Sequence, residues 1–338
     1  MKVLVTGAGG FLGGAVARQL LQRGDSVRCI QRGDYPELAA AGMEVVRGSL
    51  TDMDLTRRAV AGCDAVVHVA AKAGVWGPLK EYHDSNVVAT RVLLQACRDE
   101  GIGRFVYTST PSVVHSGGDV AGVDESVPVS DHFESHYPAT KAIAEKEVLA
   151  CNTRDFRTVA LRPHLIWGPG DPHLVPRVLD RARRGRLRLV GGGHAKIDTI
   201  YIDNAADAHV LALDALGAPN PACAGRPYFI TQDEPVPQVE FINLILKAAG
   251  LPEERRSVSP GLAWFAGAVL ETAFSFVGAA EEPPMTRFVA RQLATAHWYD
   301  ISAARRDLGY APRVSMEEGM QRLQAWLQTH PDTQSGQG

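Results

Sequence analysis

The sequence predicts an α/β fold in which a doubly wound parallel sheet is followed by a smaller, mostly helical C-terminal lobe. Two observations lead to this prediction. Short apolar runs alternate with longer, helix-like stretches through the first half of the chain, and after about Pro163 clustered glycine and proline end the alternation. A repeated strand-then-helix pattern forms right-handed βαβ units, whose parallel sheet binds ligands at the carboxyl ends of its strands.

Strands are expected where short runs of apolar and β-branched residues occur. They are Lys2–Thr6, Ser26–Gln31, Met43–Arg47, Ala65–Ala70, Arg104–Ser109 and Arg157–Arg162. Helices are expected where apolar residues recur with helical spacing, for example over Phe11–Gln22, Leu55–Ala61 and Ala89–Glu100. These elements assign residues 1–163 to the domain that holds the sheet.

The rest of the chain is predicted to divide between that domain and the lobe. Residues 197–225 are expected to return to the first domain, which leaves 164–196 and 226–328 for the lobe, and the polar tail 329–338 is expected to be disordered. Gly261–Ala280 is almost wholly apolar, with Glu271 as its only charge. This segment fits a buried lobe helix, a wall over an apolar substrate or a membrane-surface contact, and its glycines argue against a transmembrane span.

The composition is that of an ordinary globular protein, with 45% hydrophobic and 22% charged residues among 338. A net charge of -3, without any recognisable motif, argues against nucleic-acid binding. The five cysteines form no C-x-x-C pair, which fits reduced thiols. The first expected strand begins at once with no signal peptide before it, so a cytoplasmic location is predicted.

A glycine-rich turn, "VTGAGGFLGG", follows the first expected strand and opens a helix, with Gly7, Gly10 and Gly13 three residues apart. Glycine permits the tight turn and lets backbone N–H groups approach a pyrophosphate, while the helix N-terminus adds its positive end. In this position the turn predicts that residues 1–163 form a dinucleotide-binding Rossmann domain. The alternative is a plain strand-to-helix turn.

The choice of dinucleotide depends on the end of the second expected strand, where an acidic residue would bind the ribose hydroxyls of NAD. Gln31 and Arg32 stand there instead. No carboxylate would repel a 2′-phosphate, and the Arg32 guanidinium could bind one. NADP(H) is therefore predicted over NAD(H), the alternative being that Arg32 is a solvated surface arginine.

Tyr137 and Lys141 are four residues apart, and Pro138 between them suits the first turn of a helix that would place both on one face. A nearby ammonium favours the phenolate, so Tyr137 is expected to have a lowered pKa and to exchange its proton near neutrality. Ser109 and Thr110 close the fifth expected strand, where hydroxyls could bind a substrate carbonyl. The glycine turn, the Ser/Thr strand end and Tyr-x-x-x-Lys, in this order, predict a ketone or alcohol oxidoreductase.

With these residues in place, the chain resembles the extended short-chain dehydrogenase/reductases, and within them the 3β-hydroxysteroid dehydrogenase-like branch. The resemblance extends to about Gln328 and includes "LRPHLIWGPGD" and "YDISAARRDLGYAP". It implies that Tyr137 is the proton donor or acceptor and that Lys141 holds the nicotinamide ribose. It also implies that Thr110, with Ser109 beside it, binds the substrate carbonyl. The cofactor-lining residues that it implies are Phe11, Leu12, Ala70, Ala71, Lys72, Tyr137, Lys141 and Pro163.

A closer similarity, in "AAKAGVWG", "YTSTPSVV" and "EEPPMTRFVARQLATAHWYD", is to the reductases of bacterial long-chain olefin biosynthesis. It implies NADPH-dependent reduction of a long-chain 2-alkyl-3-oxoalkanoate, a β-keto acid, to the 2-alkyl-3-hydroxyalkanoate. It also makes a multi-enzyme assembly with other olefin-pathway enzymes plausible, and the wider family implies a homodimer. Six arginines between 177 and 188 form either a solvated face or a docking surface for an acidic partner.

Five aromatic residues near the expected active edge are candidates for binding the substrate. Trp76 and Trp167, each in a glycine-rich loop, would either line the pocket or pack in the core. His115, His136 and His164 are candidates for the substrate carboxylate, and each could instead be a structural histidine. No cluster has metal-ligand spacing, so no metal is predicted.

Other functions remain open from the sequence. A hydroxysteroid or other bulky-alcohol dehydrogenase would use the same residues. A sugar-nucleotide dehydratase is disfavoured because Pro111 and Ser112, rather than an acidic pair, follow Thr110. From another class, a non-catalytic NADPH-sensing regulator would not need the tyrosine and lysine, whose presence favours catalysis.

Overall fold

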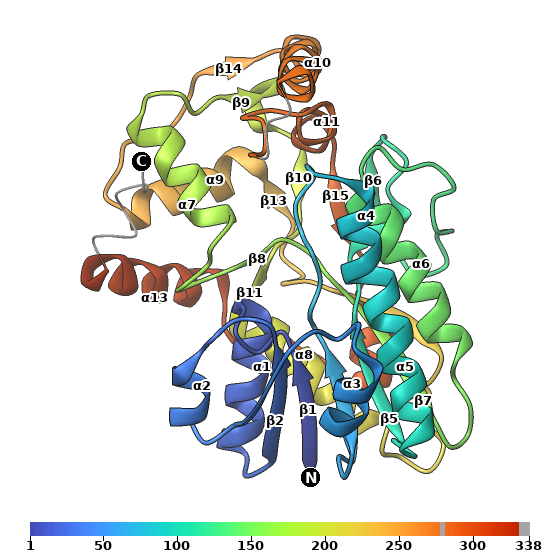
Figure 1. The fold of residues 1–338 in the computed structure, drawn as a ribbon. Helices are drawn as coiled ribbons and strands as arrows, with labels where there is room; N and C mark the ends of the chain where they lie inside the picture. Colours follow the sequence, from blue (N-terminus) through green and yellow to red (C-terminus); the bar gives the residue numbers. More distant parts are fainter. Residues whose placement is uncertain (278–280, 331–338) are drawn as a thin grey trace.

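The computed structural model describes residues 1–277 and 281–330, and its centre is a parallel sheet of seven strands (Figure 1). Their spatial order is β12-β7-β5-β4-β1-β2-β3, and every neighbouring pair is parallel. The strands are β1 (Lys2–Thr6), β2 (Ser26–Gln31), β3 (Glu44–Arg47), β4 (Ala65–His68), β5 (Arg104–Thr108), β7 (Arg157–Pro163) and β12 (Arg226–Ile230). Because all seven run the same way, their carboxyl ends meet at one edge, as the doubly wound prediction requires.

Helices cover both faces of this sheet, and the prediction of a doubly wound α/β fold is confirmed. They are α1 (Phe11–Gln22) and α8 (Ile202–Ala215) on one face, and α3 (Met53–Val60), α5 (Ala89–Asp99) and α6 (His136–Ala150) on the other, with α2 (Pro36–Ala40) between β2 and β3. Successive strand residues point to opposite faces, so Val3 and Val5 pack with α1 whereas Leu4 packs with α5. Two buried cores result, one on each side of the sheet.

The lobe lies beyond the carboxyl edge of the sheet, at the top of Figure 1. Its helices are α7 (Leu174–Arg183), α9 (Gln238–Ala248), α10 (Pro260–Phe276), α11 (Arg287–Ala294) and α13 (Met316–Thr329). Short strands join it to the sheet domain: β6 (Val120–Val123), β10 (Lys196–Ile197), β13 (Val236–Pro237) and β15 (His297–Tyr299) in one sheet, β8 (Ile166–Trp167) with β11 (Ile200–Tyr201), and β9 (Leu189–Val190) with β14 (Ser257–Val258). The sheet β13-β10-β15-β6 contains residues from both halves of the chain.

The predicted boundary of the lobe is wrong at residue 226. β12 pairs with β7 along its whole length, from Arg226 opposite Val159 to Ile230 opposite Pro163, and so completes the main sheet. Much later in the chain, α12 (Ser302–Leu308) also falls outside the lobe, because it packs on α8 and β12. The sequence does not indicate that β12 belongs to the main sheet, because a short apolar run does not reveal which strand it pairs with. Within 197–225, α8 packs on α1.

Two further expectations concern where helices α13 and α10 end. The predicted tail at 329–338 starts too early, because Thr329 is the last residue of α13; residues 331–338 lie outside the described part. The apolar segment Gly261–Ala280 forms α10 up to Phe276, while residues 278–280 are likewise outside the described part. Among residues 1–277 and 281–330, no helix has the length and apolar character needed to cross a bilayer.

Helix α10 is not a buried lobe helix. It packs on α11 through Gly267, where a Cβ atom would lie 2.7 Å from the backbone carbon of Thr286. Its opposite side exposes Phe265 and Phe276 with relative accessibilities of 62% and 93%. The segment was expected to be a buried helix, a wall over an apolar substrate or a membrane-surface contact. The first is excluded, because one face of α10 is exposed.

A buried ion pair fixes α6 to β7. Arg162 donates from Nε to Glu145 Oε2 at 2.9 Å and from Nη2 to Oε1 at 2.6 Å, and both side chains are almost inaccessible to solvent. The Arg162 guanidinium also lies 5.2 Å from the centre of the Phe229 ring on β12. Each charge compensates the other, because either one buried alone would strongly lower the stability of the fold.

We expect Arg162→Leu to lower the free energy of unfolding by about 3–5 kcal/mol, because it leaves the Glu145 carboxylate buried and unpaired. The double variant Glu145→Leu/Arg162→Leu should recover most of that loss. Urea unfolding at pH 7 measures both, and Arg91→Leu is the control because its exposed pair with Glu147 should contribute less than about 1 kcal/mol. Equal losses for Arg162→Leu and Arg91→Leu would contradict the prediction.

Candidate active site

The glycine turn forms a close approach between β1 and α1. Gly7 has a φ of +73°, and a Cβ atom there would lie 3.0 Å from the backbone of Ala70. At Gly13 a Cβ atom would lie 2.2 Å from the carbonyl oxygen of Gly7, so no larger residue fits. The N–H of Gly10 closes the turn on the same Gly7 oxygen at 2.9 Å. The first turn of α1 is thereby brought to the carboxyl edge of the sheet, where it can receive a phosphate.

A cavity of about 930 Å³ opens along this edge. Most of the predicted site residues line it, although they come from the ends of five strands and from α6. Those that line it are Gly7, Gly10, Phe11, Leu12, Gly13, Gln31, Arg32, Ala70, Ala71, Lys72, Ser109, Thr110, Tyr137, Lys141, Pro163 and His164. A single groove therefore runs from the glycine turn to the Tyr-x-x-x-Lys pair.

The end of this groove nearest β2 has the features expected of a coenzyme-binding site. The Oε1 atom of Gln31 accepts a hydrogen bond from the N–H of Gly9 at 3.0 Å, while Gln31 Nε2 is buried without a partner in the described residues. Arg32 is exposed, lines the cavity and makes no hydrogen bond or ion pair with any described residue. Ser49 and Thr51, after β3, complete this end. The sequence reasoning missed these two hydroxyls, because nothing in a short polar loop signals its place beside β2.

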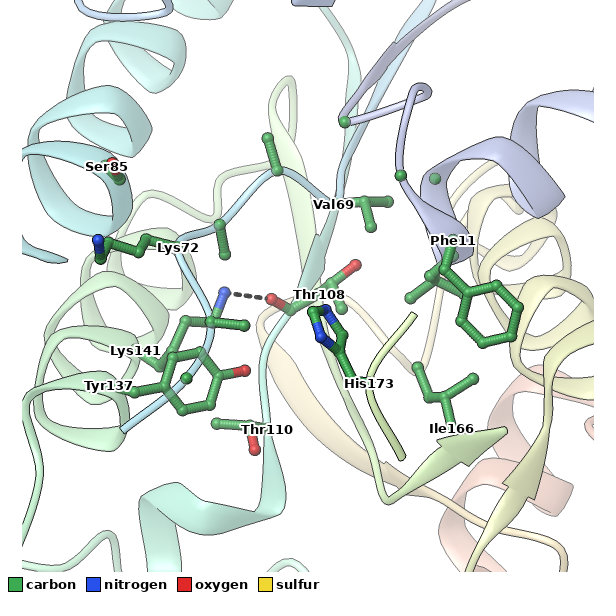
Figure 2. A pocket seen from close by; sticks show the side chains of 18 of the residues that line it. Phe11, Val69, Lys72, Ser85, Thr108, Thr110, Tyr137, Lys141, Ile166 and His173 are labelled. Carbon is green, nitrogen blue, oxygen red and sulfur yellow. Dashed lines mark hydrogen bonds between the residues drawn. The ribbon is translucent and has the colours of Figure 1, made fainter. Parts of the chain in front are cut away.

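Tyr137 and Lys141 project from α6 into the cavity on the same side (Figure 2). The Lys141 ammonium is buried, donates to the carbonyl oxygen of Thr108 at 2.5 Å and lies 4.1 Å from the centre of the Tyr107 ring. Burial lowers the pKa of Lys141 to about 7, against the opposing effect of the Glu145 carboxylate one turn further along α6. The amine of Lys141 is therefore about half protonated near pH 7.

The expected acidification of Tyr137 is wrong for this structure. Burial raises the pKa of Tyr137 to about 12, and a hydrogen bond with the Thr110 side chain opposes that shift only in part. The ammonium of Lys141 is directed to the Thr108 carbonyl and contributes no compensating effect on the phenol (Figure 2). Desolvation, which a residue spacing does not reveal, outweighs the charge. Tyr137 thus holds its proton at neutral pH.

Ser109 and Thr110 lie opposite Tyr137 at the end of β5. The Ser109 N–H donates to Leu161 on β7 at 2.6 Å, whereas its hydroxyl is buried and has no partner among the described residues. The Thr110 hydroxyl accepts from the N–H of Ser112 at 3.3 Å. A buried hydroxyl without a partner beside a cavity is available to a ligand oxygen.

Asn86, which the sequence reasoning missed, ties the cavity wall to α6. It lies in the π-helical segment η1 (His83–Val88), where its Oδ1 accepts from the Lys72 N–H at 2.7 Å. Its Nδ2 donates to the Lys72 carbonyl at 3.1 Å and to Thr140 on α6 at 3.0 Å. A π-helical turn is often found at a functional site, but no residue spacing announces it.

The five aromatic residues predicted as candidates for substrate binding lie in different places. His164 lines the cavity; His115 is buried against His297. His136 is exposed, packs near the ring of Tyr82 and does not line this cavity in the described structure. Trp76 is partly buried and does not line the cavity in the described part of the chain, whereas the residues before it, Ala73, Gly74 and Val75, do.

Of the two alternatives for Trp167, lining the pocket or packing in the core, the structure has the second. Its side chain is fully buried, donates from Nε1 to Thr199 at 3.1 Å and packs against Tyr201 and Phe241. Pairing of β8 with β11 turns this residue into the core, and no feature of its glycine-rich loop indicates that pairing. The lobe instead contributes Phe288 and Gln292 of α11 to the cavity.

The cavity fits a nicotinamide dinucleotide. The glycine cradle leaves room for a pyrophosphate at the start of α1, and unpartnered polar groups stand at both ends of the groove, at Gln31 and at Ser109. Gln31 and Arg32 would hold the adenosine end, while Tyr137 and Lys141 would meet the nicotinamide end.

Comparison with known proteins agrees with this geometry. The model of the 3-beta hydroxysteroid dehydrogenase/isomerase family matches residues 4–260. The 2-alkyl-3-oxoalkanoate reductase of Stenotrophomonas maltophilia is 53% identical over 96% of this chain and 99% of its own length. The protein of the same name from Shewanella oneidensis is 50% identical over 96% of this chain and 85% of its own length.

More distant proteins share the whole architecture. The mouse sterol-4-alpha-carboxylate 3-dehydrogenase, decarboxylating, is 30% identical over 95% of this chain and 89% of its own length. Among solved structures, a double mutant of the dTDP-glucose 4,6-dehydratase DesIV from Streptomyces venezuelae, with NAD and DAU bound, superposes with a TM-score of 0.76. It is 25% identical, and the match covers 98% of each chain.

The lowered pKa of Lys141 predicts how stability depends on pH. Below about pH 7 the amine is charged in both states and its burial penalty is complete; above about pH 10.5 it is neutral in both and the penalty is absent. The coenzyme-free wild type should therefore gain stability relative to Lys141→Met between these limits, by up to about 1.4 kcal/mol per pH unit.

Urea unfolding of the wild type and Lys141→Met between pH 7 and pH 9.5 tests this prediction. The exposed Lys146 on the same helix provides the control, since Lys146→Met should show no such trend. A difference between wild type and Lys141→Met that stays constant with pH would show that Lys141 is not desolvated as described.

Proposed function

The chain belongs to the 3-beta hydroxysteroid dehydrogenase/isomerase family, and from that membership we propose that it is an NADPH-dependent reductase of long-chain 2-alkyl-3-oxoalkanoates. One observation carries the proposal. Tyr137, Lys141, Thr110 and Ser109 open on the same cavity as the glycine turn, in a chain that is 50–53% identical to reductases of that name. The product would be the 2-alkyl-3-hydroxyalkanoate.

In the mechanism we propose, the hydroxyls of Ser109 and Thr110 hold the ketone oxygen of the substrate. Bound NADPH supplies the hydride that reaches the carbonyl carbon. As negative charge develops on the oxygen, Tyr137 transfers its phenolic proton to it, and the raised pKa of Tyr137 means that this proton is present at neutral pH. Lys141, whose pKa is near neutrality, then helps to return a proton to the phenolate. The ketone would thereby gain two electrons and two hydrogens, one as the hydride and one as the proton of Tyr137.

The preference for NADPH over NADH rests on Arg32. Its guanidinium lines the β2 end of the cavity, is exposed and has no acidic partner among the described residues. The neighbouring Gln31 places no negative charge near a 2′-phosphate, and its side chain is held by the Gly9 N–H. A free guanidinium beside an uncharged amide suits the phosphorylated ribose.

The names of two groups of relatives support the substrate class. A 2-alkyl-3-oxoalkanoate carries its ketone on the carbon next to the one that bears the carboxylate. The name sterol-4-alpha-carboxylate 3-dehydrogenase describes the same arrangement, since carbon 3 is oxidised beside a carboxylate on carbon 4. Phe11, Val69, Ile166 and Phe288 give the cavity apolar wall for the alkyl chains.

A second candidate is a 3β-hydroxysteroid dehydrogenase, because a Mycobacterium tuberculosis relative, 3 beta-hydroxysteroid dehydrogenase/Delta 5-->4-isomerase, is 35% identical over 94% of this chain. Parallel assays with a 2-alkyl-3-oxo acid and with a 3β-hydroxysteroid separate the two. A non-catalytic NADPH sensor would turn over neither.

For partners and location, we propose a cytoplasmic homodimer that associates with other enzymes of olefin biosynthesis.

The arginine-rich segment 177–188 offers less free charge than its composition suggests. Arg177 pairs with Glu282 and Arg184 with Asp180, while Arg181 donates to the Pro284 carbonyl. Light scattering of the purified protein measures the oligomeric state directly.

The assay for the proposed function is oxidation of NADPH in the presence of a synthetic 2-alkyl-3-oxodecanoic acid. Wild type should turn over, and Tyr137→Phe should lose about 10²- to 10⁴-fold in kcat while still binding NADPH, because only the proton donor is removed. Tyr228→Phe is the matched control, since its hydroxyl bonds to Asp307 away from the cavity. Full activity in Tyr137→Phe would refute the mechanism.

Coenzyme choice is tested by Arg32→Ala. We expect KM for NADPH to rise about tenfold or more and KM for NADH to stay unchanged, since a charge-assisted bond to the 2′-phosphate contributes about 1.5–3 kcal/mol. The control is Arg58→Ala, an exposed arginine on α3 that does not line the cavity. If Arg32→Ala keeps the wild-type preference, another group must recognise the phosphate.

A further inference from the structure

Three histidines from distant parts of the chain meet beside the cavity. His115 follows the 3-10 turn η2 (Pro111–Val114), His164 follows β7, and His297 lies in β15. All three are buried, and the ring of His297 has its centre 4.3 Å from that of His115 and 6.2 Å from that of His164. We call these residues the histidine cluster. The proposed mechanism does not use it.

Hydrogen bonds engage both nitrogens in two of the three rings. His115 Nδ1 accepts from the Gly117 N–H at 3.3 Å, and His115 Nε2 meets His297 Nδ1 at 2.9 Å. His297 Nε2 in turn meets the Thr295 hydroxyl at 2.9 Å. The third ring differs, because Nδ1 of His164 is buried and has no partner in the described structure. His164 is also the member that lines the cavity.

The charged groups around the cluster do not include a carboxylate that pairs with it. Burial lowers the pKa of His164 to about 4 and that of His297 to about 2, and the rings lower one another further. Arg291 on α11 lowers the pKa of His115 and is itself paired with Glu134. From the β10–β11 loop, Asp198 presents its backbone carbonyl to His164, while its carboxylate accepts from the Tyr299 N–H at 3.1 Å.

No group of His, Cys, Asp or Glu within the described residues is arranged to hold a metal ion. The histidine cluster consists of three neutral imidazoles. Among them His164 lines the cavity and has a ring nitrogen without a partner in the described structure. A buried nitrogen without a partner is costly, and a ligand that satisfies it would recover that cost.

The cluster lies next to the residues that would hold the ketone. Ser109 on β5 bonds to Leu161 on β7, and continuing that register places Thr110 opposite Pro163, one residue before His164. His115 follows Thr110 after one short turn. In a β-keto acid a single carbon separates the ketone carbon from the carboxylate carbon. Neighbouring strand ends are therefore the right places for the two binding groups.

We propose that the histidine cluster binds the substrate carboxylate through His164, with a proton taken up on binding. The proposal rests on the proposed β-keto acid substrate and adds the group that selects it. An anion brought to a neutral imidazole favours the imidazolium form, so a carboxylate and a proton would enter together. His115 and His297 would position His164 and share the added proton through their hydrogen-bonded rings.

Binding of an unreactive acid tests the proposal without requiring turnover. With NADP⁺ saturating, calorimetric titration with 2-hexyldecanoic acid near pH 7.5, in two buffers of different ionisation enthalpy, should show binding with uptake of about one proton. The methyl ester should bind without proton uptake. His164→Leu should weaken binding of the acid about 10- to 100-fold and abolish the proton uptake, while the ester changes less than about threefold. His164→Gln, which keeps a hydrogen-bonding side chain, should lie between the two.

A kinetic measurement shows whether the same group serves the reaction. In the NADP⁺-linked oxidation of a 2-alkyl-3-hydroxydecanoic acid, His164→Leu should raise KM with little change in kcat, and should leave the methyl ester unaffected. His132→Ala, an exposed histidine outside the cavity, is the control. Equal losses for acid and ester would overturn the proposal in favour of a structural histidine, as would acid binding without proton uptake. If wild type oxidises neither compound yet binds the acid with a proton, the proposed reaction fails and the carboxylate site stands.

Discussion

The hydrogen bond from Lys141 to the carbonyl of Thr108 joins the helix that carries the proposed acid to the strand that leads to the hydroxyls proposed to bind the substrate carbonyl. One turn further along α6, the buried pair of Glu145 and Arg162 joins the same helix to the neighbouring strand β7. Two buried polar contacts, one of them an ion pair, thus set α6 against β5 and β7. Together with the Asn86–Thr140 hydrogen bond, these contacts hold the helix that carries Tyr137.

Burial has opposite consequences for the two groups of the Tyr-x-x-x-Lys pair. It raises the pKa of the phenol and lowers that of the amine, since both shifts favour the uncharged form. A protonated phenol beside an amine that is about half protonated near pH 7 is suited to giving a proton to an alkoxide, which is the requirement of ketone reduction.

Most of the sheet domain could be predicted because each strand and helix there carries a local signal. The glycine turn, the bounds of β1, β2 and α1, and the order of the elements follow from the period of apolar residues and from glycine spacing. Strand β12 and the core position of Trp167 could not, since both depend on a strand partner far along the chain. The pKa of Tyr137 depends on desolvation, which exists only once the cavity is closed.

The pairing of β15 with β6 brings residues 297–299 beside residues 120–123, so the substrate side of the site needs nearly the whole chain. During synthesis on the ribosome, the glycine cradle and the Tyr137 helix emerge long before α11 and β15. Domains fold from the N-terminal side as they emerge, so a nascent chain would be able to capture coenzyme while its substrate pocket is still open. A chain that ends before residue 287 would lack the wall formed by Phe288 and Gln292, and it would also lack α12, which packs on α8 and β12.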